Sequence, residues 1–540
     1  MERREAIIIG GGLNGLTAAA YLARAGVDVL LLDRNEKLGV AEQGFEVSPG
    51  FHLPRFTLGI NRLPAKTIFD LDLTNYGLRV ARLDGGVSLM ADGRYHASYN
   101  DALIYRRELA RLSPRDADAW PRFRRDMLRA SRALDQALTH VMRDLSRPSL
   151  DALRGLLGGT DRLARIPIED LHDLVRLWAQ PCASFLDSYF ESDVLKAHFA
   201  SRALAGTTLG PLAPSSACFL MNLFRGDSGP ANGGAPASVM ALGGPDALVE
   251  AFTTCIKANG GNIRTEAEVI SIALKDGKAQ GVVLANGEEI RADAVLSDLD
   301  LKRSFLTLFA WNDLPKGFVE RVGKFRLRGV TAKLNLALDT MPSFPAAPKN
   351  SPALAGGVRL VQTMEGLECS FDDWRHAMPP RTPLIEMLIP SMVDRSFAPP
   401  GKHVMSVALH YVPEHLYDGD WTPERKRELT TRALMAIAAH SPGIVDHIVA
   451  METLVPSDIE SEVGLTSGDF EQGEMTLDQL FINRPMPGLS GYETPIRNFY
   501  LCSGSAHPGA LDVGGAGAGA ARLVVEAFEK KSNAQKGRAS

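Results

Sequence analysis

Three glycines near the start of the chain have the spacing of a phosphate-binding loop. Gly10, Gly12 and Gly15 form the pattern G-x-G-x-x-G directly after the apolar residues 6–9. In such a loop the first glycine permits a tight turn, the second lets the backbone approach a pyrophosphate, and the third brings a helix close to a strand. The free N–H groups at the start of that helix then face the phosphates.

An acidic residue follows at the distance expected of a ribose-binding group. Asp33 stands at the end of a second apolar run, residues 27–32, where its carboxylate could accept hydrogen bonds from a ribose diol. A glycine loop alone is weak evidence, and a glycine-rich turn without a nucleotide is the alternative. Strand, glycines, helix, strand and acid in this order predict a dinucleotide site, but they do not separate FAD from NAD.

Two distant segments predict further parts of the same fold. Residues 239–300 predict a helix followed by a small β-meander, with Asp276-Gly277 and Asn286-Gly287 as hairpin turns. Residues 499–529 predict a strand, a loop and a helix whose first turns are rich in glycine. Glycine has little helix propensity, so either close helix packing or a flat ligand against the backbone would explain that composition.

The chain resembles a known family on segments that span nearly its full length. The motifs are similar to those of the phytoene desaturase and carotenoid isomerase group of amine-oxidase-like flavoproteins, and they look closest to the branch called pyridine nucleotide-disulfide oxidoreductase domain-containing protein 2. The segments that carry the resemblance are residues 10–33, 48–51, 243–244 with the meander after them, 473–475, 478–481, 484–485, 492–495, 500–502 and 507–509.

The resemblance implies a bound FAD and assigns a part of the chain to each part of it. The adenosine would lie on Asp33 and Arg34, with the adenine edge against the backbone near Val269. The pyrophosphate would lie on the loop from Gly12 through Leu13 and Asn14 to Gly15. The isoalloxazine would lie near residues 505–515, where the candidate contacts are Gly504, Ser505, Asp512, Val513 and Gly514.

Some positions depart from the family's pattern. Val40 and Ala41 follow Gly39 where relatives commonly have a Gly-Gly-Arg element, Ser505 replaces a common aspartate, and Gln472 replaces a histidine of the close branch. Residues 510–512 read Ala-Leu-Asp where most relatives have Gly-Gly-Val. Asp512 therefore puts an acid at a normally apolar position beside the flavin.

Asp512 and His507 are the candidate bases for removing a proton after hydride loss, and Asp458 and Glu460 are weaker candidates. Burial beside the flavin would raise the pKa of Asp512 toward neutrality. The alternative is that Asp512 only caps the glycine-rich helix.

Two long insertions separate the three nucleotide-binding segments. The first is rich in helical patterns from residue 101 to 224, and the second carries expected strands near 330–338, 384–389 and 404–411. We expect an α/β fold in which a Rossmann-type, amine-oxidase-like FAD-binding domain is interrupted by a mixed α+β substrate or cap domain. The first domain would comprise residues 1–75, 236–300 and 495–530, and the second residues 76–235 and 301–494.

The expected function is that of an FAD-dependent oxidoreductase. As the resemblance implies, a dehydrogenase, desaturase or isomerase would move a hydride between flavin and an apolar or unsaturated carbon substrate. The alternatives are an amine or amino-acid oxidase of the same superfamily, and a non-catalytic partner-binding protein stabilised by FAD. Aromatic residues between 174 and 224 fit either an apolar substrate tunnel or an ordinary helical core.

Composition narrows the expected partners. The formal net charge is −5 over 540 residues, without a long block of one sign, so nucleic acid is not expected. Five scattered cysteines, together with histidines such as His198 and His410, show no metal-ligand spacing and no Cys-x-x-Cys.

We expect a cytoplasmic protein, because a core strand begins at residue 6 and no apolar run reaches the length of a membrane span. The basic residues in 122–132 could touch an anionic membrane surface, although a solvated helix face is the simpler interpretation. The sequence does not indicate the oligomeric state.

Overall fold

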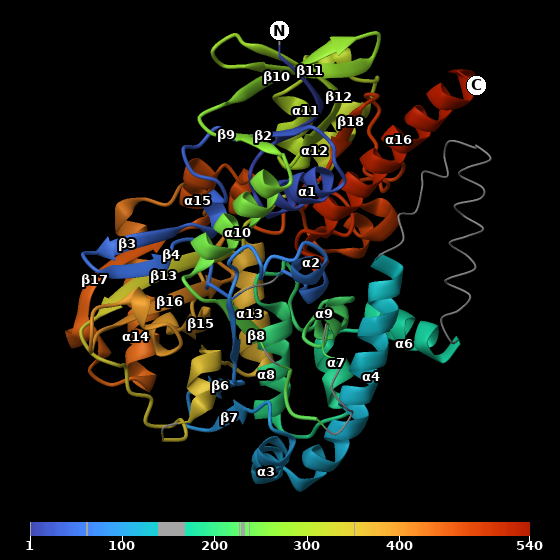
Figure 1. The fold of residues 1–540 in the computed structure, drawn as a ribbon. Helices are drawn as coiled ribbons and strands as arrows, with labels where there is room; N and C mark the ends of the chain where they lie inside the picture. Colours follow the sequence, from blue (N-terminus) through green and yellow to red (C-terminus); the bar gives the residue numbers. More distant parts are fainter. Residues whose placement is uncertain are drawn as a thin grey trace.

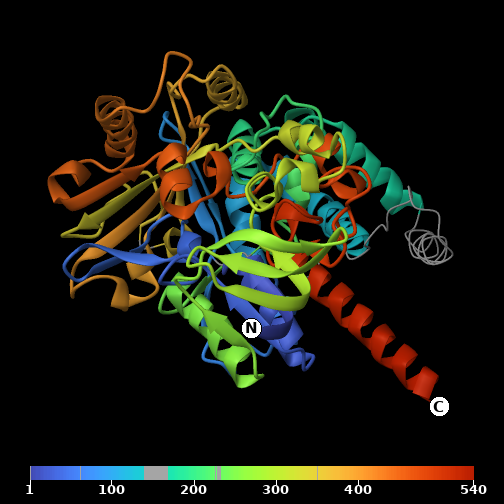
Figure 2. The ribbon, with the colours of Figure 1, turned by 90° about the horizontal axis from the view of Figure 1, so that it is seen from above.

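Two seven-stranded sheets organise the computed structural model of the chain (Figure 1). The structure describes residues 2–60, 63–138, 168–225, 227, 233–236, 238–349 and 351–539. Viewed from above, the segments that build the first sheet lie beside the helices of the first insertion, and the second sheet lies on the other side (Figure 2).

The first sheet contains the predicted nucleotide-binding segments. Its order is β10-β11-β12-β1-β2-β9, and β18 pairs with the C-terminal end of β12. The hairpin strands β10 and β11 are antiparallel additions to a parallel centre. The strands are β1 (Arg3–Ile9), β2 (Val29–Leu32), β9 (Asn262–Arg264), β10 (Val269–Lys275), β11 (Lys278–Leu284), β12 (Glu289–Ser297) and β18 (Phe499–Leu501).

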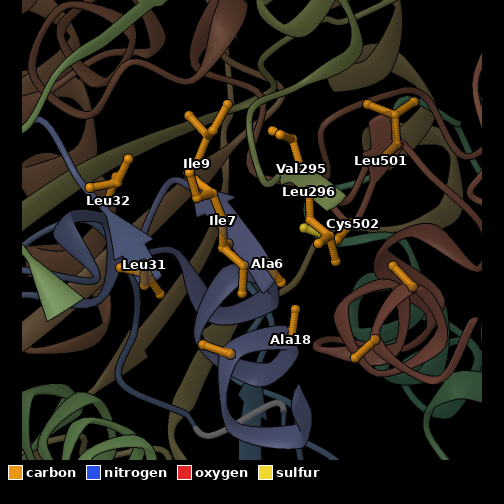
Figure 3. Close-up of a cluster of buried hydrophobic side chains, with 14 of the residues drawn as sticks. Ala6, Ile7, Ile9, Ala18, Leu31, Leu32, Val295, Leu296, Leu501 and Cys502 are labelled. Carbon is orange, nitrogen blue, oxygen red and sulfur yellow. The ribbon is translucent and has the colours of Figure 1, made fainter. Parts of the chain in front are cut away.

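The centre of this sheet is buried on both faces, as the apolar runs predict. Strand β1, with Ile7 and Ile9, lies between its neighbours β2 and β12. Leu31 and Leu32 belong to β2, and Val295 belongs to β12 (Figure 3). Helix α1 (Leu13–Arg24) connects β1 to β2 and packs against α16 (Gly515–Ala539).

The glycines at the start of α16 serve close helix packing. A Cβ on Gly517 would lie 2.1 Å from the carbonyl oxygen of Asn14, and one on Gly519 would lie 2.1 Å from the Tyr492 hydroxyl. Side chains at these two positions would push α16 away from α1 and from the loop before β18. The packing alternative therefore accounts for both glycines.

The second sheet is largely antiparallel, with the order β17-β13-β16-β15-β14-β6-β7. The strands expected near 330–338, 384–389 and 404–411 are confirmed in its centre. Its edge is formed by residues 86–98 of the first insertion, which the sequence did not predict as strands. The strands are β6 (Gly86–Leu89), β7 (Tyr95–Ser98), β13 (Thr331–Leu338), β14 (Val358–Leu360), β15 (Leu384–Leu388), β16 (His403–His410) and β17 (Ile448–Leu454).

Helices of the first insertion form a separate aromatic core beside this sheet. Trp120 and Phe199 stack at 5.9 Å between ring centroids, and Phe123 packs edge-on against Phe190 at 4.9 Å. These aromatic rings pack directly against one another, so the aromatic residues between 174 and 224 form mainly an ordinary helical core. The helices are α3 (Ala102–Leu112), α4 (Pro114–Leu138), α6 (Ile168–Ala179), α7 (Cys182–Asp187), α8 (Asp193–Leu204) and α9 (Phe219–Asn222).

The basic stretch on α4 is interrupted by burial and by acidic partners. Arg124 is 3% exposed and forms an ion pair with Asp227 at 2.7 Å, and Arg129 pairs with Asp173 at 3.3 Å. Contact of this helix with a membrane stays a prediction. Within the described ranges, no helix combines the length and apolarity needed to cross a membrane.

The remaining elements connect the two sheets. The small hairpin of β3 and β4 packs against the second sheet, and β5 pairs with β8 across the expected boundary between the two domains. The exact domain boundaries therefore stay a prediction. The elements are α2 (Ala65–Asp70), β3 (Gly44–Ser48), β4 (Phe51–Pro54), β5 (Val80–Leu83), β8 (Ser238–Ala241), α10 (Pro245–Ala258), α11 (Leu301–Leu306), α12 (Phe318–Lys324), α13 (Met364–Arg375), α14 (Pro423–His440) and α15 (Pro456–Val463).

Candidate functional site

A cavity of about 830 Å³ runs from the glycine loop of the first sheet to one face of the second. Its size is typical of cofactor and small-molecule sites. One end is lined by Asp33, Arg34 and Val269, and the middle by residues 9–14. The far end is lined by residues of α8, α9 and the second sheet.

Asp33 is fixed at the first end of this cavity. One carboxylate oxygen accepts the Gly11 N–H at 2.7 Å, and the other accepts the backbone and side-chain N–H groups of Asn35 at 2.8 and 2.9 Å. Asp33 is 8% exposed, and the hydrogen bonds from these N–H groups compensate its carboxylate for the water that it loses. A carboxylate oxygen can accept more than one hydrogen bond, which leaves capacity for a ribose.

Each glycine of the loop occupies a position where a side chain would be strained or would clash, as the motif predicts. Gly10 has φ +98°, and a Cβ on Gly15 would lie 2.1 Å from the Gly10 carbonyl oxygen. A Cβ on Gly12 would lie 2.6 Å from Oδ2 of Asp298. Gly10, Gly12, Leu13 and Asn14 line the cavity, whereas Gly15 holds α1 against the strand.

Asp298, which the sequence reasoning did not single out, lies beside the N-terminus of α1. Burial raises the pKa of its carboxyl well above the usual range, and the nearby charge of Asp33 acts in the same direction. The N–H groups of Gly12 and Gly15 oppose this shift without overcoming it. A raised pKa favours the protonated carboxyl, which repels a phosphate less than a carboxylate does.

The C-terminal segment contributes backbone and small side chains to the cavity wall. Gly504, Val513 and the neighbouring Gly509 and Ala510 line it. Ser505 does not, because its hydroxyl accepts the Leu301 N–H at 3.0 Å and donates to the Gln472 carbonyl at 2.8 Å. Gly514, beneath Thr17, also lies outside the wall.

The four sequence-predicted bases lie away from the lining. His507 is 4% exposed and is not part of the wall. Asp458 accepts the Val455 N–H at 2.9 Å at the start of α15, and Glu460 follows in the same helix.

Asp512 lies 3.9 Å from the Arg225 guanidinium, and burial raises its pKa, as predicted. Its main-chain carbonyl accepts the Gly515 N–H at 2.9 Å, at the beginning of α16. This position brings Asp512 to the helix start rather than to the cavity.

A row of residues across the second sheet provides polar groups that the sequence reasoning missed. Neighbouring strands align Arg359 with Glu386, Glu386 with Ala408, and Ala408 with Lys333. All four line the cavity. A charged residue inside an otherwise apolar strand was the available signal, since Lys333 and Glu386 interrupt the runs of residues 330–338 and 384–389.

Lys333 is a buried amine on the cavity wall. It is 1% exposed, and its Nζ donates to Asn335 Oδ1 at 2.7 Å and to Ser406 Oγ at 2.6 Å. Burial lowers the pKa of Lys333 to about 7, although the charge of Glu452 opposes the shift. Lys333 therefore exchanges a proton near neutral pH.

The carboxylate of Glu386 has one partner on each of its oxygens. Its Oε1 pairs with Arg359, and its Oε2 accepts from His410 Nε2 at 3.0 Å. Burial alone would raise the pKa of Glu386, but Arg359 and His410 outweigh burial and lower it to about 2. The Gly206 N–H donates to His410 Nδ1 at 3.1 Å, which places the ring proton on Nε2.

Comparison with known proteins agrees with this arrangement. Residues 8–67 match the NAD(P)-binding Rossmann-like domain. Pyridine nucleotide-disulfide oxidoreductase domain-containing protein 2 of Rattus norvegicus is 32% identical over 548 residues, which cover 96% of this chain and 93% of the rat protein. The chain belongs to the family of this protein. Phytoene desaturase (lycopene-forming) of Paracoccus sp. is 25% identical and covers 94% of each chain.

The chain also shares its fold with amine oxidases. A structure of putrescine oxidase bound to putrescine has a TM-score of 0.59 at 14% identity and covers 98% of this chain and 99% of the oxidase, which shows the shared fold. Despite the word disulfide in the family name, no disulfide joins the described cysteines, and none of them lines the cavity.

Proposed function

We propose that this family member binds FAD along the cavity and moves a hydride between FAD and a small carbon-based substrate held against the second sheet. The observation that carries the proposal is the continuity of the cavity from the dinucleotide loop to Lys333 and the polar row. A nicotinamide dinucleotide could use the same loop. The small residues Gly504 and Gly509 on the wall beyond the loop support a flat isoalloxazine there.

The residues of the cavity fit FAD at both ends of the loop. Asp33 presents a carboxylate suited to a ribose diol. The first turn of α1 reaches the cavity at Leu13 and Asn14, where a helix N-terminus favours a pyrophosphate. Val40 and Ala41 also line the cavity, so backbone and apolar contacts replace the basic residue of relatives. FAD supplies reversible two-electron chemistry when bound.

Lys333 is the proposed proton-holding group in place of Asp512 and His507. Its Nζ would accept a proton from the substrate when the substrate is oxidised, and would return one in the reverse direction. Its pKa suits proton transfer near pH 7. Asn335 and Ser406 hold the amine toward the wall, and the buried sheet around it excludes water. Phe219, Leu223 and Val330 offer an apolar surface for the body of the substrate.

A substrate screen under anaerobic conditions tests this proposal. We expect a carbon substrate to bleach the yellow protein at the flavin absorbance band, and NADPH to bleach it poorly, because the chain has one credible dinucleotide motif. Rapid stoichiometric bleaching by NADPH would reveal a second nucleotide site. Retention of FAD with no bleaching by any compound in a broad screen would favour the non-catalytic alternative.

A further inference from the structure

Arg202 is a cation at the far end of the cavity. It lies near the end of α8 and lines the cavity wall, and within the described part of the chain its guanidinium has no hydrogen bond or ion pair. The surrounding protein, together with the charge of Arg359, lowers the pKa of Arg202 to about 10, so it stays charged at neutral pH. A partly buried charge without a partner is costly unless a ligand supplies one.

Arg202 and Arg359 have one neighbouring carboxylate between them, that of Glu386. Arg359 pairs with Glu386, whose second oxygen accepts from His410 Nε2. Burial lowers the pKa of His96 to about 3 and that of His198 well below its usual value, so these neighbours carry no charge at neutral pH.

A second unsatisfied group lies on the same wall. Asn222, at the end of α9, lines the cavity, and its Oδ1 is buried without a hydrogen-bond partner among the described residues. Helix α9 packs against α8, which carries Arg202. The amide could turn its N–H₂ group toward an acceptor on a ligand, because its two ends are exchangeable by rotation.

We propose that Arg202, next to Arg359 and assisted by Asn222, binds a carboxylate of the substrate. This inference rests on the proposed function. A guanidinium presents two parallel N–H groups that match the two oxygens of a carboxylate. The substrate is therefore a carboxylic acid with an apolar body, which is a more specific class than the apolar or unsaturated carbon substrate expected from the sequence.

The span of the polar row indicates how far the carbon chain of this acid would extend. Arg359 and Lys333 stand on strands three places apart, which corresponds to on the order of 14 Å at the usual strand spacing of about 4.8 Å. Ala408 lies between Glu386 and Lys333 with a side chain too small to block the space above the row. An acid bound at Arg202 would extend its carbon chain along this row toward Lys333.

Matched eight-carbon probes test the carboxylate site. Octanoate, octanamide and octyl phosphate would be titrated into the FAD-loaded protein, with thermal unfolding and the flavin absorbance spectrum as readouts. We expect octanoate to bind more tightly than octanamide, by at least about tenfold. Equal binding of these two probes, or no binding of octanoate, would overturn the inference. Tighter binding of octyl phosphate would overturn the carboxylate assignment in favour of a phosphate.

Two variants and one control locate the effect. Arg202→Met should remove the preference for octanoate while keeping FAD, and Arg202→Lys should retain part of it because the charge remains. Arg107→Met, at an exposed position of α3, should behave as the wild type. Unchanged octanoate binding by folded, flavin-loaded Arg202→Met contradicts the site. Absence of FAD from the wild-type protein would instead refute the proposed function, so the two failures are separable.

Discussion

Lys333 shows how one buried side chain sets a pH dependence. The pKa of its amine is lowered to about 7, so below this pH the Nζ carries a proton and cannot accept another. We expect the rate of flavin bleaching by a substrate to rise as pH increases through about 7 and then level off. In Lys333→Gln the rate should fall by about 100-fold and lose this inflection, since a positioned base typically contributes 10²–10⁴-fold.

Two further variants separate Lys333 from other groups in that experiment. Lys257→Gln changes an exposed lysine of α10 and should keep the wild-type profile. Asp512→Asn should also keep it, because Asp512 does not line the cavity. A loss of about 100-fold in Asp512→Asn with FAD still bound would return the role of base to Asp512, and an unchanged profile in Lys333→Gln would exclude the amine.

At the scale of single residues, the sequence indicated the nucleotide loop but not the polar row that we propose as the catalytic face. Asp33 and the glycine loop are local in sequence, so their spacing reveals their common purpose. Arg202, Arg359 and Lys333 lie on three separate elements and meet only in the folded chain. Asp512 looked like a candidate because it is an acid near a flavin segment, but the direction of its side chain depends on the turn before α16.

At the scale of elements, Arg484 joins the loops that form the wall near Gly504. It is fully buried, and its guanidinium donates to six main-chain carbonyls, those of Glu471, Gln472, Gly473, Glu474, Gln479 and Gly504. Burial lowers the pKa of Arg484 to about 10, which still leaves it charged. The residue therefore fixes the loop around 471–474 against the segment after β18.

We expect Arg484→Met to lower the free energy of unfolding by about 3–5 kcal/mol, because it leaves several buried carbonyls without donors. The displaced wall should also weaken FAD retention during dialysis. Chemical denaturation and the flavin content of the same sample measure both effects. Arg107→Met, which has an exposed side chain, is the matched control. Stability and FAD content equal to those of the control would show that Arg484 does not hold the loops.

Elements with strong apolar periodicity were predictable, and those defined by distant pairing were not. Strand β2 and residues 6–9 of β1 are apolar runs that a sheet buries, and β13 is apolar apart from Thr331, Lys333 and Asn335, so their positions follow from composition. Strands β6 and β7 are short and become the edge of the second sheet only by pairing with β14, more than 250 residues later. No local pattern encodes that partner.

At the scale of the whole molecule, the two insertions combine to close a cavity that the nucleotide-binding segments open. The first insertion supplies α8, α9 and the sheet edge, and the second supplies the remaining strands of the sheet. The sequence indicated that a cap interrupts the fold, but which faces would meet depended on long-range packing. This joint construction places the nucleotide loop and the polar row on one continuous wall.

The cofactor content of the purified protein tests the central claim most directly. The protein would be denatured and the released nucleotide identified and quantified by chromatography, for the wild type and for Asp33→Ala after dialysis. We predict release of FAD, and not FMN or NAD, with roughly ten- to hundredfold weaker retention in Asp33→Ala, because a charge-assisted hydrogen bond contributes about 1.5–3 kcal/mol. A colourless protein that takes up no added FAD, or equal retention by the two proteins, would contradict the account.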